Sequence, residues 1–201
     1  MQKILERLCA MYTDEEICCA MKVRKMRNMF YRLLDSKYKD GNELCFIGMY
    51  FYYVKEDMKN ATKYYLRAIE KNNSYAMSNL GWYYYLEEKY DEMKKYYLMA
   101  IEKGNASAMN GLGHYYKKTE INYNKMKKYY LMAIEKGCAN SMYNLGCYYN
   151  NTEINHNEMK KYYLMAIGKG DAKAMNNFGY YYNHTEINYD EMKKYYLMAI
   201  E

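Results

Sequence analysis

The sequence predicts an all-α solenoid of about five helix-turn-helix repeats that follow an N-terminal helical cap. Two observations predict this fold. The block MKKYYLMAI occurs four times, at Met93, Met126, Met159 and Met192, which is once every 33 residues. A diverged copy, ATKYYLRAI, precedes them at Ala61. Short apolar blocks at this interval are typical of helical solenoids, in which stacked helix pairs bury one continuous core.

Residues 1–41 lie outside the repeat and predict the cap. The sequence Thr13-Asp14-Glu15-Glu16 resembles a capping box that opens one helix. The apolar side of that helix carries Ile17, Met21, Met29, Phe30, Leu33 and Leu34, and its polar side carries Lys22, Arg24, Lys25, Arg27 and Arg32. We expect the apolar side to cover the first repeat, because a solenoid needs polar-faced ends. A basic docking helix is the alternative.

The five repeats are expected at about 42–73, 74–104, 105–137, 138–170 and 171–201. In the fourth, Ala139 to Asn150 has helical spacing and forms a helix A, and the segment 151–155 forms a turn. Helix B starts after Asn155, which with Glu158 predicts an N-cap, as Asn188 does with Glu191. Helix B is expected to end at a glycine, Gly104, Gly137 or Gly170, because glycine readily adopts the left-handed conformation that closes a helix.

A second glycine recurs inside each helix A, at Gly48, Gly81, Gly113, Gly146 and Gly179. An interior helical glycine costs about 1 kcal/mol relative to alanine. The recurrence therefore predicts that helix B passes too close for a Cβ atom. A matching small residue is expected from helix B, at Ala68, Ala100, Ala133, Ala166 and Ala199.

Composition excludes several classes of protein. Hydrophobic residues make up 51% of the chain and charged residues 27%, so it is not a disordered polyampholyte. The net charge of +6 is smaller than expected for a dedicated nucleic-acid binder. No secretory signal or membrane-length apolar stretch is visible, which predicts a cytoplasmic location and no membrane contact. The six cysteines are expected to be buried thiols rather than a disulfide framework.

The fifth repeat carries a family resemblance. Ala174, Phe178-Gly179 and Tyr182 match the first helix of the Sel1-like repeat, a relative of the tetratricopeptide repeat. Asp190, Tyr195-Tyr196 and Ala199-Ile200 match its second helix, with tyrosine in place of tryptophan. The resemblance covers about residues 43–201 and implies a right-handed α-α superhelix that acts as an adaptor or scaffold in protein complexes. The Lys-, Asn- and Tyr-rich composition also resembles that of repeat proteins of giant DNA viruses, which would place the chain in a host cytoplasm.

The sequence departs from the family pattern in two places. The small residue before the aromatic pair is kept as Ala61 but is Met93 and its equivalents in the later repeats. The glycine-containing turn is replaced by Thr-Glu-Ile-Asn, as at 119–122.

Helix A varies between repeats at positions fixed relative to its glycine. Offsets of three and four residues place these positions on one helical stripe, and the resemblance implies that this stripe lines a concave groove. We expect it to bind a protein or peptide partner, with Trp82, Tyr143 and Tyr180 as aromatic anchors and asparagines as hydrogen-bonding groups. The alternative is drift after duplication. The expected binding residues are Tyr75, Ser78, Trp82, Tyr85, Asn110, His114, Lys117, Tyr143, Cys147, Asn150, Asn176, Tyr180 and Asn183.

The lysine pairs of helix B, such as Lys94-Lys95, predict a solvated face; electrostatic binding of nucleic acid or an acidic partner is the alternative.

Enzyme, metal and cofactor chemistry find no support. His114, His156 and His184 occupy three different places in the repeat, and the cysteine spacing matches no zinc pattern. The sequence therefore predicts a non-catalytic protein without cofactors. It does not indicate the oligomeric state.

Overall fold

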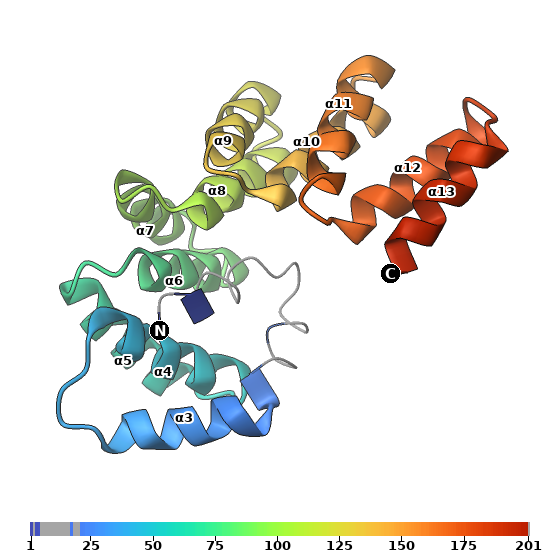
Figure 1. Ribbon diagram of the computed structural model, residues 1–201. Coiled ribbons are helices and arrows are strands. Elements are labelled where there is room, and N and C mark those ends of the chain that lie inside the picture. Colours follow the sequence, from blue (N-terminus) through green and yellow to red (C-terminus); the bar gives the residue numbers. More distant parts are fainter. Residues whose placement is uncertain (2, 5–16, 18–20, 201) are drawn as a thin grey trace.

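The computed structural model describes residues 1, 3–4, 17 and 21–200 of the 201-residue chain, and the regular structure of these residues is helical (Figure 1). The described helices are α3 (Arg24–Asp35), α4 (Gly41–Tyr53), α5 (Met58–Glu70), α6 (Ser74–Leu86), α7 (Tyr90–Glu102), α8 (Ala106–Lys118), α9 (Tyr123–Glu135), α10 (Ala139–Asn151), α11 (His156–Ile167), α12 (Ala172–His184) and α13 (Tyr189–Ile200). From α4 onward, each even-numbered helix (helix A) packs mainly against the helix that follows it (helix B). The predicted solenoid of helix pairs is confirmed.

The predicted N-terminal helix is interrupted. Val23 is extended, with a ψ of 145°, and α3 begins one residue later. The single helix expected across residues 13–34 is therefore wrong at this point, and the capping-box residues Thr13 to Glu16 lie outside the described residues. The expected apolar side is nevertheless buried: Phe30 is 1% exposed and stacks on Tyr50 of α4 with ring centroids 4.1 Å apart.

Side-chain caps begin most of the repeat helices. Asp40 and Glu43 form a capping box at the start of α4, which therefore begins one residue before the predicted repeat boundary. Asn155 accepts a hydrogen bond from the backbone N–H of Glu158, as predicted, and Asn188 accepts one from that of Glu191. Helices α6, α8 and α12 are capped by Asn73, Asn105 and Asp171, which the sequence analysis did not identify.

Left-handed residues close both kinds of turn. Gly104, Gly137 and Gly170 have φ values of 75°, 80° and 80° after helix B, as predicted. Between helix A and helix B the left-handed position holds Ile121, Ile154 and Ile187, with φ values of 50°, 51° and 44°. A β-branched residue is strained in this conformation. These isoleucines are 64–67% exposed, so burial of their side chains does not offset the strain.

The helix A glycines contact tyrosine rings. A Cβ atom at Gly146 would lie 2.5 Å from the ring of Tyr163, and Gly48, Gly81, Gly113 and Gly179 meet the equivalent tyrosine of their own repeat. The predicted close approach is confirmed, but the expected pairing of glycine with alanine is wrong. The tyrosine ring of helix B is the nearest group to each of these glycines, and alanines such as Ala166 are also buried.

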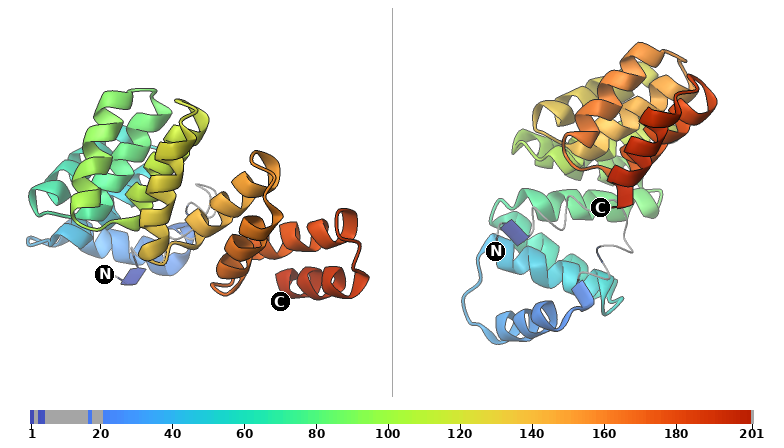
Figure 2. Two further views of the ribbon diagram at one scale, coloured as in Figure 1. Left: turned by 90° about the horizontal axis from the view of Figure 1, so that it is seen from above. Right: turned by 45° about the vertical axis from the view of Figure 1, so that its right-hand side comes forward.

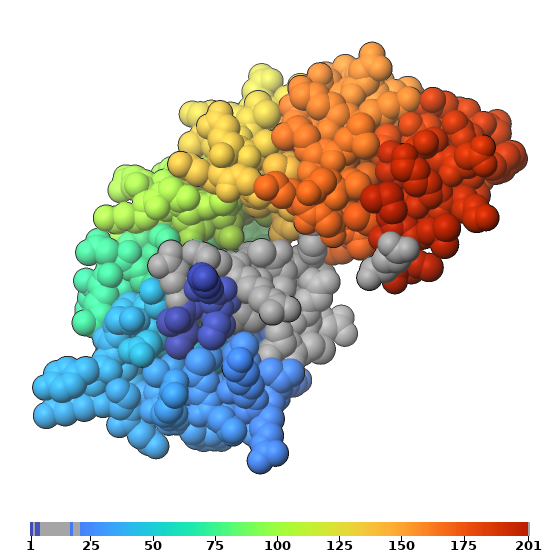
Figure 3. All heavy atoms as spheres, in the orientation of Figure 1, coloured from blue at the N-terminus to red at the C-terminus, as the bar shows by residue number. Residues whose placement is uncertain are grey.

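The stacked pairs form an arc (Figures 1 and 2). Helix α4 contacts α6, α6 contacts α8, and α8 contacts α10, whereas contacts of similar extent between successive B helices do not occur in the described part of the chain. A stack in which only one set of helices touches must curve toward that set. The A helices therefore lie on the inner side of the arc, and the space-filling view shows the C-terminal repeats standing apart from the first ones (Figure 3).

Candidate partner-binding groove

The A helices on the inner side of the arc carry the variable stripe. Its expected binding residues come from α6, α8, α10 and α12, and most are half-buried rather than fully exposed. Ser78 is an exception: only 6% of it is exposed, so it is buried and does not face solvent as we expected. It is buried because α6 lies between α4 and α8.

An aromatic section occupies the second and third repeats. The rings of Trp82 and Tyr85 stack with centroids 5.3 Å apart, and Tyr85 meets His114 edge-on at 5.5 Å. This run joins α6 to α8 across the repeat boundary. Burial lowers the pKa of His114, which keeps its imidazole neutral at neutral pH, and its Nδ1 atom is buried with no hydrogen-bond partner among the described residues.

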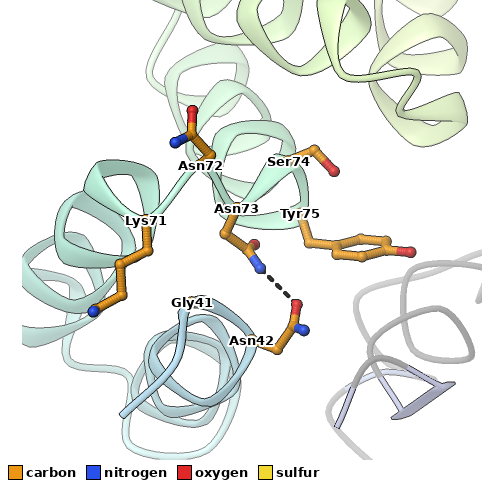
Figure 4. A pocket seen from close by; sticks show the side chains of 7 residues that line it. All are labelled: Gly41, Asn42, Lys71, Asn72, Asn73, Ser74 and Tyr75. Carbon is orange, nitrogen blue, oxygen red and sulfur yellow. Dashed lines mark hydrogen bonds between the residues drawn. The ribbon is translucent and has the colours of Figure 1, made fainter. Parts of the chain in front are cut away.

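Two further aromatic residues of the stripe lie away from this run. Tyr180 on α12 is 57% exposed and stacks on His184 with centroids 4.0 Å apart. Tyr75, at the start of α6, lines a hollow of about 280 Å³ beside Asn42 and Asn73, whose side chains are joined by a 2.7 Å hydrogen bond (Figure 4). The hollow is shallow and polar, and Tyr75 points outward from it.

Hydrogen bonds between repeats use part of the stripe. The Oδ1 atom of Asn110 accepts bonds from Ser141 Oγ at 2.9 Å and from Asn144 Nδ2 at 3.2 Å. One repeat later, Asn177 Nδ2 donates to the hydroxyl of Tyr143 at 3.3 Å. Asn110 and Tyr143 therefore stabilise the stacking of repeats, a role that sequence reasoning missed. The signal was available, because asparagine recurs two residues before the helix A glycine at Asn79, Asn144 and Asn177.

The C-terminal section of the stripe is rich in polar groups. Cys147 accepts hydrogen bonds from the Tyr163 hydroxyl at 3.4 Å and from Asn177 at 3.7 Å, and burial raises the pKa of Tyr143 to about 12. Asn150 and Asn183 are half-buried, and Asn176 is exposed.

Lys117 lies between this section and the aromatic one. Burial lowers the pKa of its ammonium group, so the group is held partly away from water.

The lysine rows of helix B are only partly solvated. The first lysine of three pairs binds a glutamate in the turn of the next repeat: Lys94 Nζ lies 2.7 Å from Glu120 Oε1, Lys127 pairs with Glu153 at 2.6 Å, and Lys160 pairs with Glu186. Each ammonium group also lies over a tyrosine ring of that repeat. These lysines therefore join neighbouring repeats, and the second lysine of each pair remains exposed.

The described residues do not assemble a metal site. Among them, no three histidine, cysteine, aspartate or glutamate side chains come together in a way that could hold an ion. His114, His156 and His184 lie in three different repeats. Cys45 is buried, as expected, whereas Cys138 and Cys147 are free thiols that are only half-buried, so the expectation of buried thiols is wrong for these two.

Within the described residues, none of the helices combines the length and apolar character that crossing a lipid bilayer requires.

Several solved structures share this arrangement of helices. A Sel1 repeat protein from Oxalobacter formigenes matches 92% of this chain and 76% of its own at 21% identity, with a TM-score of 0.64. A protective antigen of uropathogenic Escherichia coli, described as having an SLR fold, matches 88% of this chain and 39% of its own at 23% identity, with a TM-score of 0.65. An immunity protein from Pseudomonas aeruginosa matches 98% of this chain and 81% of its own at 15% identity, with a TM-score of 0.69.

No protein-family model and no curated protein sequence matches this chain. The likeness therefore lies in the three-dimensional arrangement of the repeats, and at these identities it shows the fold alone. The chain is an all-α solenoid with the fold of the Sel1-like repeat proteins.

Proposed function

We propose that this chain is a non-catalytic scaffold or adaptor that binds an extended peptide or a helix of another protein along the inner stripe of its A helices. The observation that carries the proposal is the run of Trp82, Tyr85 and His114 across two repeats. Aromatic side chains of this kind dominate the energetics of protein interfaces. The likeness to proteins named as immunity proteins fits a role in protein binding.

The chemistry of the inner stripe favours a protein partner over nucleic acid. Its side chains are mainly aromatic rings, amides and hydroxyls, and Lys117 is the only residue of the expected set with a permanent charge. Nucleic-acid affinity depends mainly on many cationic contacts to phosphates. His114, His156 and His184 lie in three different repeats, which fits a non-catalytic role.

The test compares Trp82→Ala and Tyr180→Ala with a matched control. Tyr189 is 65% exposed at the start of α13 and does not belong to the stripe, so Tyr189→Ala removes a similar ring from another surface. A partner is first isolated from native cells by affinity purification and identified by mass spectrometry. We expect the two stripe variants to weaken its binding about tenfold or more, and the control to leave it within about twofold.

Thermal unfolding of each variant must show an intact fold, because Trp82 also stacks on Tyr85. Unchanged affinity in both folded stripe variants would refute the groove as the binding surface.

The second candidate function is electrostatic binding of nucleic acid or of an acidic surface. Exposed basic residues of α3, such as Arg24, Lys25 and Arg27, favour it. The ion pairs of Lys94, Lys127 and Lys160 count against it, because they neutralise three of the eight lysines in the helix B pairs. Salt titration separates the two: a steep linear fall of log affinity with log salt supports phosphate contacts, and a weak dependence supports groove packing.

A further inference from the structure

Partly buried lysines in this solenoid follow a pattern. Lys94, Lys127 and Lys160 have side chains that are 28–32% exposed, and each binds a glutamate of the next repeat. Removing an ammonium group from water costs free energy unless an anion or hydrogen-bond acceptors replace the lost hydration. For each of these three lysines, a glutamate of the next repeat supplies the carboxylate.

Lys117 departs from this pattern. It is half-buried on α8, on the inner side of the arc, and no carboxylate among the described residues pairs with it. The charged or titratable groups that face it are Lys118 on the same helix and the Cys147 thiol on α10. The groove therefore holds a partly desolvated cation without an anionic partner in the described part of the chain.

Apart from the exposed Lys118, the described surroundings of Lys117 supply polar groups and no further cation. His114 lies one turn earlier on the same helix, and its imidazole is neutral because burial lowers its pKa. Asn150 occupies the position of Lys117 in the next repeat, and Tyr85 occupies it in the preceding repeat. A segment lying along the stripe would therefore meet aromatic rings, then the lysine, then amides.

We propose that Lys117 binds the side-chain carboxylate of an aspartate or glutamate in the partner, and that apolar residues of the partner on one side of this acid pack on Trp82 and Tyr85. This inference rests on the proposed function, because it names the chemistry of the segment that the groove binds. The net charge of +6 on the whole chain is complementary to an acidic segment. A carboxylate at Lys117 would form a charge-assisted hydrogen bond in a half-buried site, which is stronger than the same pair in open solvent.

The experiment selects binders from a phage-displayed library of random twelve-residue peptides against the full chain. We expect the selected peptides to share an aspartate or glutamate at one position, with aromatic or aliphatic residues on one side of it. A synthetic peptide from this set is then measured by fluorescence anisotropy against the wild type, Lys117→Gln and the control Lys118→Gln. Lys118 is the adjacent, exposed lysine, so the control removes the same charge from outside the stripe.

Lys117→Gln should weaken binding about tenfold, and Lys118→Gln should change it less than about twofold. Replacing the shared aspartate or glutamate of the peptide by asparagine or glutamine should weaken its binding to the wild type by about the same factor. The same replacement should weaken its binding to Lys117→Gln little further. This peptide arm uses the unaltered protein, so it decides the question even if Lys117→Gln does not fold.

Selected peptides that lack a shared acid, or equal binding by the acid and amide peptides, would overturn the role of Lys117 and leave the groove proposal standing. If the wild type selects no peptides, or if its peptides bind Trp82→Ala as tightly, the groove proposal itself fails and this inference fails with it.

Discussion

At the scale of single residues, the contact between a helix A glycine and a helix B tyrosine sets the distance between the two helices of a repeat. The ring of Tyr163 is fully buried, and two of its carbon atoms would lie within 2.7 Å of a Cβ atom at Gly146. Alanine is the better helix former by about 1 kcal/mol, so helix propensity alone favours the substitution. Close packing opposes it, because a buried ring with no free space cannot move aside without displacing its neighbours.

We therefore expect Gly146→Ala to destabilise the protein by about 1–3 kcal/mol, since the packing cost exceeds the gain in helix propensity. Urea unfolding measured by circular dichroism provides the test. The control is Gly168→Ala, because a Cβ atom at Gly168 would be at least 3.4 Å from its neighbours. Gly179→Ala should cost less than Gly146→Ala, since its ring, Tyr196, is only half-buried at the last repeat. Equal stability of Gly146→Ala and the wild type would show that the ring does not set the helix spacing.

At the scale of elements, the repeats differ in the residue that caps helix A. Asn73 and Asn105 cap α6 and α8, and their side-chain amides also donate to residues 31 positions earlier, Asn42 and Ser74. Asp171 caps α12 with one oxygen, while its second oxygen is buried and has no hydrogen-bond partner among the described residues. Burial raises the pKa of Asp171, because the ionised carboxylate is partly desolvated.

Asp171→Asn should therefore stabilise the protein at pH 7, by about 1 kcal/mol, because an amide keeps the cap and removes the buried charge. Its amide could also donate to Asn140, which lies 31 positions earlier. Because the pKa of Asp171 is raised in the folded state, the folded protein holds the proton more tightly than the unfolded chain. Asp171 therefore lowers the free energy of unfolding as pH rises. The difference between variant and wild type should shrink as pH falls through the raised folded pKa and disappear below the ordinary aspartate value.

Thermal unfolding between pH 3 and pH 7 measures this difference. A variant that is less stable than the wild type at pH 7 would contradict the assignment of Asp171 as a desolvated charge. The opposite substitution at an equivalent cap, Asn105→Asp, should destabilise the protein and serves as the matched control.

The turns between helix A and helix B show where sequence reasoning stopped at this scale. The repeat period and the helix A glycines predicted the helix pairs, and the cap at Asn155 predicted where α11 begins. The left-handed conformation of Ile121 and its equivalents could not be predicted, because isoleucine disfavours it and the tertiary position of the two helices imposes it. The break at Val23 was missed because the apolar spacing continues through it, from Met21 to Met29 and Phe30.

The candidate site itself stays a prediction. Comparison between repeats defined its stripe of variable helix A positions, and the A helices that carry the stripe lie on the inner side of the arc. This comparison did not distinguish residues that line the groove from those that bond the next repeat, such as Asn110. That distinction depends on how far one repeat is rotated against the next, which the residues of a single repeat do not determine.

At the scale of the whole molecule, the arc gives the chain one inner surface that spans several repeats. Contacts between successive A helices create the curvature, and the ion pairs from Lys94, Lys127 and Lys160 hold neighbouring repeats together. These pairs are partly exposed to solvent and screened by salt, so each contributes only about 1 kcal/mol. The buried tyrosines and alanines therefore provide most of the stability. In the proposed binding mode, a partner lying along the A helices would contact Trp82, Lys117 and Tyr180 together.

The most direct measurement of this account uses the single tryptophan of the chain. Trp82 gives one indole N–H signal in a nitrogen–proton correlation spectrum, and it lies in the aromatic section of the stripe. On addition of a peptide selected by the full chain, the account predicts that this signal shifts together with backbone signals of α6, α8 and α10. A bound peptide that leaves the indole signal unchanged and shifts the lysine-rich B helices instead would contradict it.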